Sequence, residues 1–287
     1  MDRQEIANRA GRFAGWFLVT DMDGTLLRSD DRISEANLAA LHRFAAEGGS
    51  FTVATGRMKG KVDPYIAQLP VTAPAILYNG SLVWDYEADC LLWGETLPQW
   101  VGSLLGPIRE AFPRTGIEVY TEDGGVYIAA DHPMTARHQR HRVTARYGLG
   151  YQSMGWRKVS FLGDPAVLDT IERTLRNDGL TLPMTRAEPD FLDILPGGVN
   201  KGVALAELTG QLGLDAARVV AVGNGQNDLE MLQQAAWSVA VANSHPSLFR
   251  AASRRGLHHD NDALADVVDW LEYTVLPWQE LRQTAVR

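Results

Sequence analysis

The stretch FLVTDMDGTLL, residues 17–27, ends a short apolar run with two aspartates that flank a single methionine. The run is rich in β-favouring residues and lacks polar interruptions, which is typical of a strand covered on both faces. Asp21 and Asp23 follow this strand directly, although two neighbouring carboxylates repel each other and resist burial. A turn that tolerates Asp and Gly is the simpler explanation for them. A bound divalent cation explains more, because it cancels the repulsion between the carboxylates.

Segments typical of strands and helices alternate on both sides of residues 17–27. The predicted strands of the first third are apolar runs at 16–20, 51–55 and 75–78, separated by helices of which the first begins after Ser34. The pattern returns near the C-terminus, with strands at 218–222 and 237–241 and helices at 201–212, 227–235, 246–253 and 262–273. Alternation of this kind indicates a parallel sheet with covering helices. We therefore predict an α/β fold whose core is a doubly wound, Rossmann-like parallel sheet.

The middle of the chain has a different pattern. Predicted strands at 117–121, 126–129, 159–162 and 191–195 are mixed there with two predicted helices, near 134–147 and 165–178. Several of these strands alternate apolar and polar residues, which indicates a sheet with one covered face. We interpret residues 85–196 as an inserted α+β domain between the two halves of the core, 1–84 and 197–287.

Length and composition limit the classes of function. The 287 residues suffice for one large domain or two ordinary ones, and 45% hydrophobic with 22% charged residues is typical of a globular protein. The formal charge of −8 argues against non-specific nucleic-acid binding, and no apolar run approaches the roughly 20 residues of a membrane helix. Cys90 is the single cysteine, and the N-terminus lacks the pattern of a secretory signal. We therefore expect a cytoplasmic monomer or homodimer with no nucleic-acid or membrane partner.

Polar side chains follow four of the predicted core strands, where an open parallel sheet collects its ligands. They are Asp21 and Asp23, Thr55-Gly56-Arg57, Asn79, and the segment 224–228, with Lys201 at the start of the preceding helix. Mg²⁺ prefers oxygen ligands and is held by one or two carboxylates together with substrate phosphate. One carboxylate can attack phosphorus while the second moves a proton. This convergence predicts a metal-dependent site for a phosphorylated substrate.

Four motifs along the chain resemble those of a known family. DMDGTLL at 21–27, ATGR at 54–57, NKG at 200–202 and GNGQNDLEML at 223–232 are similar, in this order, to the motifs of the haloacid dehalogenase-like phosphohydrolase superfamily. The chain resembles the Cof-type branch, subclass IIB, in which an α/β cap is inserted between the second and third motifs. The resemblance implies a Mg²⁺-dependent phosphomonoester hydrolase that acts on a small phosphorylated metabolite, such as a sugar or polyol phosphate, through an aspartyl-phosphate.

The resemblance also implies a role for each matching residue. Asp21 would be the nucleophile, and Asp23 would protonate the leaving alcohol and then activate water. Lys201 would neutralise charge on the phosphate and on Asp21, because phosphoryl transfer depends mainly on positioning and electrostatic stabilisation. The implied metal ligands are Asp21, Asp23 through its backbone carbonyl, Asn224 and Asp228, and the implied phosphate-binding residues are Thr55, Gly56, Lys201 and Asn227.

Two further residues have two interpretations each. Asn79, at a strand end, is expected either to hydrogen-bond substrate or phosphate, or to serve only in a two-residue Asn79-Gly80 turn. Arg57 follows the phosphate-binding threonine and is expected either to reach the substrate or to brace a neighbouring acid.

One position departs from the family pattern. The acidic motif usually reads Gly-Asp-x-x-Asn-Asp, but Asn224 stands in place of its first aspartate. A neutral amide oxygen still binds a cation, but one negative charge is lost, which predicts weaker Mg²⁺ binding and slower turnover. Two alternatives to the hydrolase stay open. One is a phosphomutase that shares the aspartyl-phosphate, and the other is a catalytically weakened protein that only binds a phosphorylated ligand.

Two pairs of histidines lie outside these motifs. His138 and His141 fall in the predicted helix at 134–147 beside several arginines, where a solvated basic face is preferred over a metal site. His258 and His259 precede Asp260, where a capped helix start is the simplest interpretation.

Overall fold

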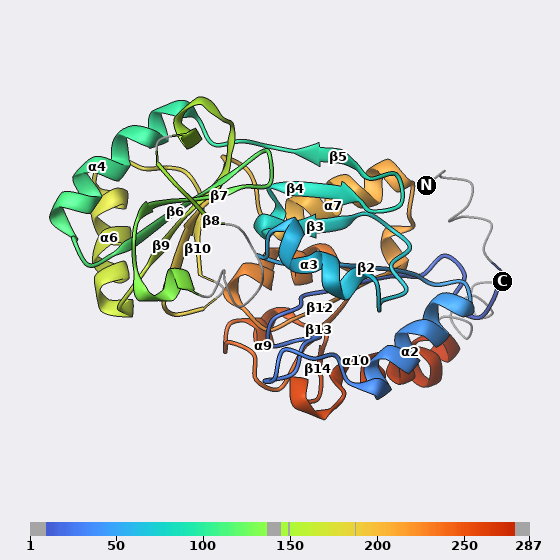
Figure 1. Cartoon of the computed structure of the whole chain (residues 1–287). Coiled ribbons are helices and arrows are strands. Elements are labelled where there is room, and N and C mark those ends of the chain that lie inside the picture. Colours follow the sequence, from blue (N-terminus) through green and yellow to red (C-terminus); the bar gives the residue numbers. More distant parts are fainter. Residues whose placement is uncertain (1–9, 137–144, 149, 187, 279–287) are drawn as a thin grey trace.

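The core of the molecule is a five-stranded parallel sheet (Figure 1). The computed structural model describes residues 10–136, 145–148, 150–186 and 188–278. The strand order is β14–β13–β12–β1–β2, and every neighbouring pair is parallel. The strands are β1 (Phe17–Thr20), β2 (Ser50–Val53), β12 (Val219–Gly223), β13 (Trp237–Ala240) and β14 (Arg254–Arg255). Because β1 lies between β2 and β12, the residues that follow β1 are flanked on both sides by the carboxyl ends of neighbouring strands.

Helices cover both faces of this sheet. Leu18 of β1 packs in one apolar cluster with Phe44 of α2 and Val267 of α10, whereas Val19 packs on the opposite face with Leu208 of α7. The helices are α2 (Glu35–Ala46), α3 (Lys59–Ile66), α7 (Lys201–Leu212), α8 (Leu229–Gln234), α9 (Leu248–Ala251) and α10 (Ala263–Trp270). The prediction of a doubly wound α/β core is therefore confirmed.

An antiparallel extension continues the core sheet beyond β2. Its strands are β3 (Ala75–Leu77), β4 (Leu82–Asp85) and β5 (Cys90–Gly94), and a parallel bridge between Ala54 and Ile76 joins β3 to the end of β2. The predicted two-residue turn is wrong, because Leu77 pairs with Leu82 and four residues therefore connect the strands. Tyr78 and Asn79 both adopt positive φ angles, 52° and 57°, in this connection.

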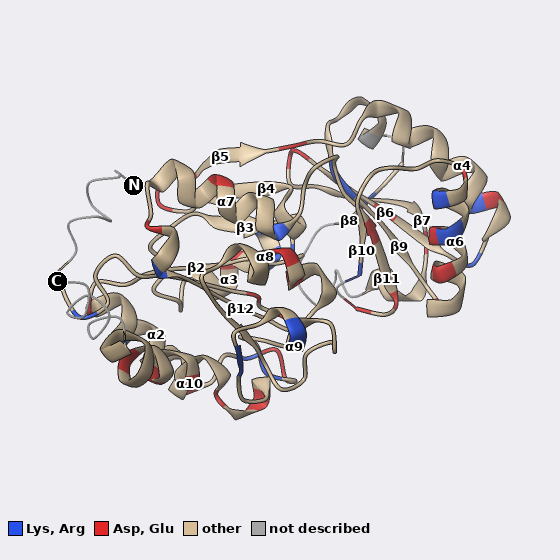
Figure 2. Ribbon diagram, turned by 180° about the vertical axis from the view of Figure 1, so that it is seen from behind, with Lys and Arg blue, Asp and Glu red and all other residues tan. Residues whose placement is uncertain are grey.

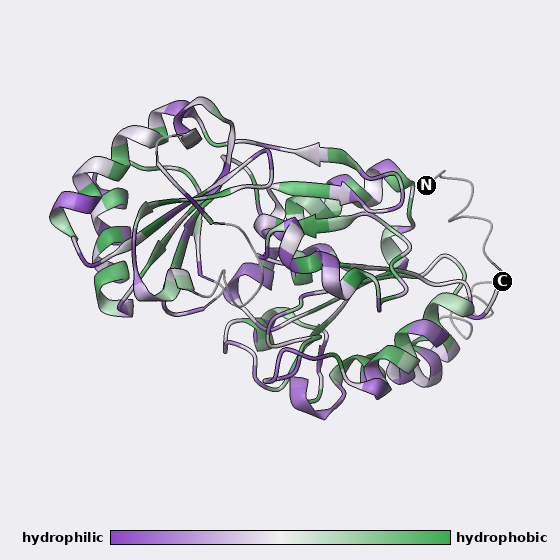
Figure 3. Ribbon diagram, in the orientation of Figure 1, coloured by the Kyte–Doolittle hydropathy of each residue, from purple (hydrophilic) through white to green (hydrophobic). Residues whose placement is uncertain are grey.

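The middle of the chain forms a separate six-stranded sheet, in the order β10–β11–β9–β6–β7–β8. Its strands are β6 (Gly116–Thr121), β7 (Val126–Ala130), β8 (Ala145–Tyr147), β9 (Trp156–Leu162), β10 (Met184–Thr185) and β11 (Phe191–Ile194). Two helices, α4 (Gly102–Ala111) and α6 (Pro165–Asn177), cover its face away from the core (Figure 1). Apolar residues line the strands of both sheets (Figure 3), while α6 carries charged residues (Figure 2).

One predicted helix of this region is wrong. Ala145–Tyr147, assigned to a helix over 134–147, is strand β8 and pairs in parallel with Val126–Ile128 of β7. Pro133–Ala136 is a short 3₁₀ turn. The remainder of the predicted helix, with His138 and His141, lies outside the described residues.

The separate sheet suggests a narrower insert than residues 85–196. Strand β5 pairs with β4, and Trp93 packs into the cluster beneath the core sheet. Leu97, in contrast, packs with Val119 and Phe161 in the apolar cluster of the six-stranded sheet. We propose that the cap domain begins near Glu95, and we call the part from there to residue 196 the cap.

Candidate active site

Lys201 joins two of the predicted acidic residues at the centre of the core. Its Nζ lies 2.6 Å from Asp21 Oδ1 and 2.6 Å from Asp228 Oδ1, and its side chain is fully buried. Asp21 follows β1, where its backbone N–H donates to the carbonyl of Val222 in β12 (2.9 Å). Lys201 is the first residue of α7, which begins where the Asn200 side chain accepts from the N–H of Val203 (2.8 Å).

The Asp228 carboxylate is fixed by backbone as well as by Lys201. Its Oδ2 accepts from the N–H groups of Asn224 and Gly225, each at 2.9 Å. Because both oxygens have donors, this buried carboxylate is held in one orientation. Lys201 binds Oδ1 of Asp21 and does not bind Oδ2, so Oδ2 is the candidate nucleophilic oxygen.

The site carries more negative charge than Lys201 balances. Burial, and after it the charge of Asp228, raises the pKa of Asp21 to about 7, although Lys201 acts in the opposite direction. Burial also disfavours the ammonium of Lys201, but Asp21 and Asp228 outweigh it and raise the pKa of Lys201 above its ordinary value. Two carboxylates against one ammonium therefore favour an additional cation.

Asp23 turns away from Lys201 toward Arg57. The Nε of Arg57 lies 2.9 Å from Asp23 Oδ2, and its Nη2 donates to Asp23 Oδ1, which makes the pair bidentate. The guanidinium stacks on the ring of Tyr65, 5.2 Å from its centroid. Of the two interpretations of Arg57, the structure shows the bracing of an acid.

The second motif, residues 54–57, makes a tight turn that ends at Arg57. The buried Thr55 Oγ1 accepts from the N–H of Arg57 (3.0 Å), so this hydroxyl shapes the turn. A Cβ at Gly56 would come within 2.9 Å of Asn79 Oδ1, so only glycine fits without displacing Asn79.

The buried side chain of Asn79 makes hydrogen bonds to both the core and the cap. Its Oδ1 accepts from Asn227 Nδ2, and its Nδ2 donates to Asp193 Oδ2, both at 2.9 Å. Neither interpretation of Asn79 described this geometry. A plain turn residue is excluded, since the side chain is used on both sides and the residue is 1% exposed.

The sequence interpretation did not identify two cap residues, Lys158 of β9 and Asp193 of β11. Lys158 Nζ lies 2.8 Å from Asp193 Oδ2 and donates to the carbonyl of Gly56 in the core (3.3 Å). It also stacks over the ring of Tyr120, 4.6 Å from its centroid. A signal was present, because Lys158 and Ser160 alternate with apolar residues along β9 and so share one face of the strand.

A cavity of about 340 Å³ separates the core from the cap at this place. The core contributes acidic, basic and amide side chains to its lining, among them Asp21, Asp23, Arg57, Asn224 and Asn227. The cap contributes Lys158, Asp193, Glu188 and Tyr120. The strand ends of the core thus face the polar surface of the cap sheet.

The predicted metal ligands suit a hard cation by their chemistry. Their donors are all oxygens, and Asn224 Oδ1 already accepts from the Thr25 hydroxyl at 3.0 Å. The carboxylates of Asp21, Asp23 and Asp228 do not bring three oxygens within 4.8 Å of one another, since the only such group in the described part of the chain lies elsewhere. Asp23 is directed to Arg57, which agrees with an expected ligand role for its backbone carbonyl rather than for its carboxylate.

Comparison with known proteins decides the family. The family model of haloacid dehalogenase-like hydrolases matches residues 18–268. The chain belongs to this family. The match includes all four motifs as well as the cap.

Three similar proteins illustrate the range of the family. The HMP-PP phosphatase of Escherichia coli O6:H1 is 28% identical over 270 residues, which are 90% of this chain and 96% of that protein. The 5-amino-6-(5-phospho-D-ribitylamino)uracil phosphatase YitU of Bacillus subtilis is 25% identical, over 87% of this chain and 95% of its own length. The solved structure of the subclass IIB sugar phosphatase BT4131 has a TM-score of 0.75 at 18% identity, and the match covers 91% and 99% of the two chains. The predicted Cof-type, capped fold is confirmed.

No helix within the described residues is both long and apolar enough to span a membrane.

Proposed function

We propose that this protein is a Mg²⁺-dependent phosphomonoester hydrolase that acts on a small phosphorylated metabolite through a phosphorylated Asp21. The observation that carries the proposal is the arrangement of Asp21 against Lys201 and Asp228. One Asp21 oxygen is held by a buried ammonium, and the residue lines a cavity that is large enough for a small metabolite. Phosphoryl transfer needs this combination of a positioned anionic nucleophile and nearby positive charge.

The chain's own residues account for both half-reactions. Asp21 Oδ2 would attack phosphorus, the bond from phosphorus to the leaving oxygen would break, and Asp23 would give its proton to that oxygen. Asp23 would then take a proton from water, whose oxygen attacks the aspartyl-phosphate and releases inorganic phosphate with free Asp21. Asp23 is paired with Arg57 in this structure, and it would have to leave this pair and take up a proton before it could act as the acid.

Asp21, Asn224, Asp228 and the carbonyl of Asp23 would hold Mg²⁺. When bound, the ion would neutralise negative charge between the nucleophile and the phosphoryl group.

The cap side of the cavity suggests the chemistry of the substrate. Lys158 offers donors and Asp193 offers acceptors on one polar surface above the core. Hydroxyl groups both donate and accept, so a sugar or polyol phosphate fits this pair better than an apolar ester. The proposal is supported by the names of two similar proteins, a phosphatase of a ribityl phosphate and a sugar phosphatase.

The test is phosphate release from a panel of sugar, polyol and nucleotide monophosphates with Mg²⁺. We expect release from at least one sugar or polyol phosphate, its loss with EDTA, and a fall of at least about a thousand-fold in Asp21→Asn. Asp30→Asn is the matched control, because Asp30 is an exposed carboxylate in the loop that follows the same motif. Activity in EDTA equal to that with Mg²⁺, or an active Asp21→Asn variant, would contradict the proposal.

The same assay separates the hydrolase from the two alternatives when the substrate phosphate is labelled. A hydrolase gives labelled inorganic phosphate. Label found at a new position of the substrate would indicate a phosphomutase, and label retained on Asp21 without release would indicate a binding protein, the alternative that Asn224 favours.

A further inference from the structure

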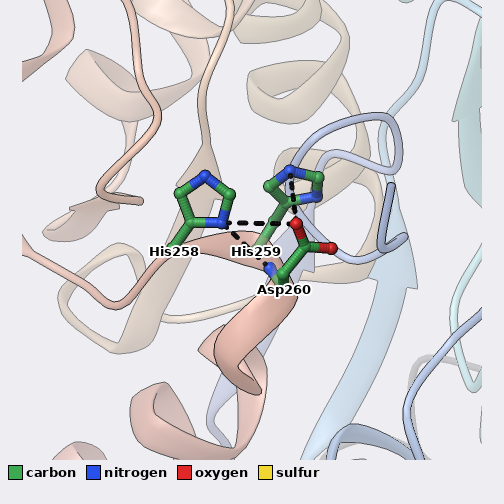
Figure 4. A group of neighbouring side chains, drawn as sticks. All are labelled: His258, His259 and Asp260. Carbon is green, nitrogen blue, oxygen red and sulfur yellow. Dashed lines mark hydrogen bonds and ion pairs between the residues drawn. The ribbon is translucent and has the colours of Figure 1, made fainter. Parts of the chain in front are cut away.

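His258, His259 and Asp260 form a group of ligand-type side chains away from the catalytic cavity (Figure 4). They lie at the start of the short η7 turn (His259–Asn261), which connects β14 to α10. One ligand atom from each residue lies within 4.8 Å of the others, and no second group of this kind was found among the described residues. The sequence interpretation of a capped start is correct for η7, where His258 accepts from the N–H of Asp260. It does not explain why the three side chains converge.

The hydrogen bonds determine which ring nitrogens carry protons. His259 Nδ1 lies 2.8 Å from the backbone carbonyl of Leu27, and a carbonyl only accepts, so Nδ1 carries the hydrogen. His258 Nδ1 accepts from the N–H of Asp260 at 3.2 Å, so it carries a lone pair. In neutral rings, His258 Nδ1 and His259 Nε2 are therefore the unprotonated nitrogens.

These two nitrogens both face one carboxylate oxygen. Asp260 Oδ2 lies 3.7 Å from His258 Nδ1 and 3.8 Å from His259 Nε2, as the dashed lines of Figure 4 show. Both distances are too long for hydrogen bonds, so neither nitrogen is bonded to Oδ2, which accepts from the Ser29 hydroxyl at 2.7 Å. A cation between them would contact all three atoms, and His258 Nδ1 would exchange its long hydrogen bond from the Asp260 N–H for the ion.

We infer that His258, His259 and Asp260 form a second metal site, selective for a divalent transition metal such as Zn²⁺ over Mg²⁺. Imidazole nitrogens favour Zn²⁺, whereas Mg²⁺ prefers oxygen ligands. Ligands roughly 2 Å from one tetrahedral ion lie roughly 3.3 Å apart, so a small inward rotation of the rings completes the site. Two histidines and one carboxylate leave a fourth position for water.

The surroundings of the three residues support a metal site. The His259 Nδ1–H donates to the Leu27 carbonyl, which fixes the ring with its free nitrogen inward, as in many metal-binding histidines. The backbone N–H and the hydroxyl of Ser29 hold the Asp260 carboxylate at 2.8 and 2.7 Å. The His258 side chain is 42% exposed, which gives an ion access from solvent.

A metal here would fasten η7 to the loop that carries the first motif. Leu27 and Ser29 belong to that loop, and His259 N–H donates to Asn243, whose Nδ2 donates to the carbonyl of Gly24. A bound ion would therefore stabilise the folded chain by mass action, independently of turnover.

The experiment is calorimetric titration of the full chain with Zn²⁺ in excess Mg²⁺, which occupies oxygen-only sites. We expect one tight Zn²⁺ per chain and a higher melting temperature with Zn²⁺. His258→Ala and Asp260→Asn are expected to lower the Zn²⁺ affinity at least about ten-fold. His258 is half exposed, so its truncation leaves no core cavity, and thermal unfolding without metal checks that both variants fold.

His42→Ala is the matched control, because His42 is an exposed histidine on α2 far from this group in the sequence. It is expected to bind Zn²⁺ as the wild type does. Wild-type affinity in both site variants, or no Zn²⁺ binding by the wild-type chain, would overturn the inference.

Discussion

Asn224 shows how one side chain can set the strength of a site whose geometry is intact. Its backbone N–H holds Asp228, and its Oδ1 accepts from Thr25, so the residue keeps its structural contacts without a charge. Gly24 has a φ of +70°, and a Cβ there would lie 2.5 Å from Asn224 Nδ2, which shows how closely the two loops pack. An aspartate has the same shape as this asparagine. The difference between the two is therefore mainly electrostatic.

We predict that Asn224→Asp strengthens Mg²⁺ binding. The added charge lies beside the proposed cation, so the Mg²⁺ concentration for half-maximal activity should fall about ten-fold, or ~1.4 kcal/mol. Activity titrations with Mg²⁺ measure this. Asn177→Asp, on the exposed end of α6, adds the same charge far from the site and should leave the titration unchanged. Equal curves for Asn224→Asp and the wild type would refute this account of Asn224.

A pH dependence follows from Asp21. Burial and Asp228 raise its pKa from 3.8 to about 7, so the folded protein binds this proton more tightly than the unfolded chain. The resulting stabilisation is complete below about pH 4 and is lost as pH rises toward 7. In EDTA, Asp21→Asn should therefore gain in melting temperature relative to the wild type between pH 5 and 8. A difference in melting temperature between Asp21→Asn and the wild type that stays constant from pH 5 to 8 would count against a raised pKa of Asp21.

At the scale of elements, α7 positions the central ammonium. Asn200 is the N-cap residue of this helix, and Lys201 is its first residue. The N-cap and the central lysine of the site therefore lie in the same helical turn. Helix α6 begins in a comparable way, with the Asp164 side chain accepting from the N–H of Ala166 at 2.8 Å, but on the far side of the cap. The two helix starts form a natural pair for comparison.

We predict that Asn200→Ala and Asp164→Ala each lower the free energy of unfolding by about 1 kcal/mol, the usual contribution of an N-cap side chain to a helix. Only Asn200→Ala should also lower kcat several-fold, because fraying of the first turn of α7 displaces Lys201. Denaturant unfolding and steady-state kinetics on both variants measure this. An equal loss of kcat in Asp164→Ala would mean that general destabilisation is the cause.

At the scale of the whole molecule, the cap meets the core through buried polar groups. Asp193 binds Asn79, and Lys158 binds both Asp193 and the carbonyl of Gly56. Tyr120, Val126 and Ile128 of the cap also pack in the apolar cluster of the core, but apolar contacts have little directional preference. A chain of hydrogen bonds from Asn227 to Asp193 instead defines how the cap surface sits above the catalytic strand ends.

We predict that Asp193→Ala lowers the free energy of unfolding more than the double variant Lys158→Met/Asp193→Asn does. The single change leaves the Lys158 charge buried without its partner, which costs about 3–5 kcal/mol, whereas the double change removes both charges. Unfolding titrations of the single and double variants measure the two losses of stability. Both variants should raise KM for a polyol phosphate more than for a small aryl phosphate without hydroxyls. Equal changes in KM for the two substrates would remove Lys158 and Asp193 from substrate selection.

The limits of the sequence interpretation lie in the cap. Helix α4 was not predicted, because Gly102, Gly106 and Pro107 interrupt its pattern, yet Leu105 and Ile108 bury it against the cap sheet. Residues 145–147 were assigned to a helix, but pairing with β7 makes them a strand. Packing and edge pairing outweighed local propensity in both places.

The sequence by itself determined the α/β core and placed Asp21, Lys201 and Asp228 together, since the ends of neighbouring parallel strands meet at one edge whatever the loops do. Only the tertiary structure decided that Asp23 turns to Arg57, that Asn79 bridges to Asp193, and that Lys158 reaches the core. These contacts join residues from different elements, and those between the cap and the core join residues more than a hundred positions apart. Their partners depend on how the cap docks, and docking is a property of the packed surfaces rather than of any local pattern.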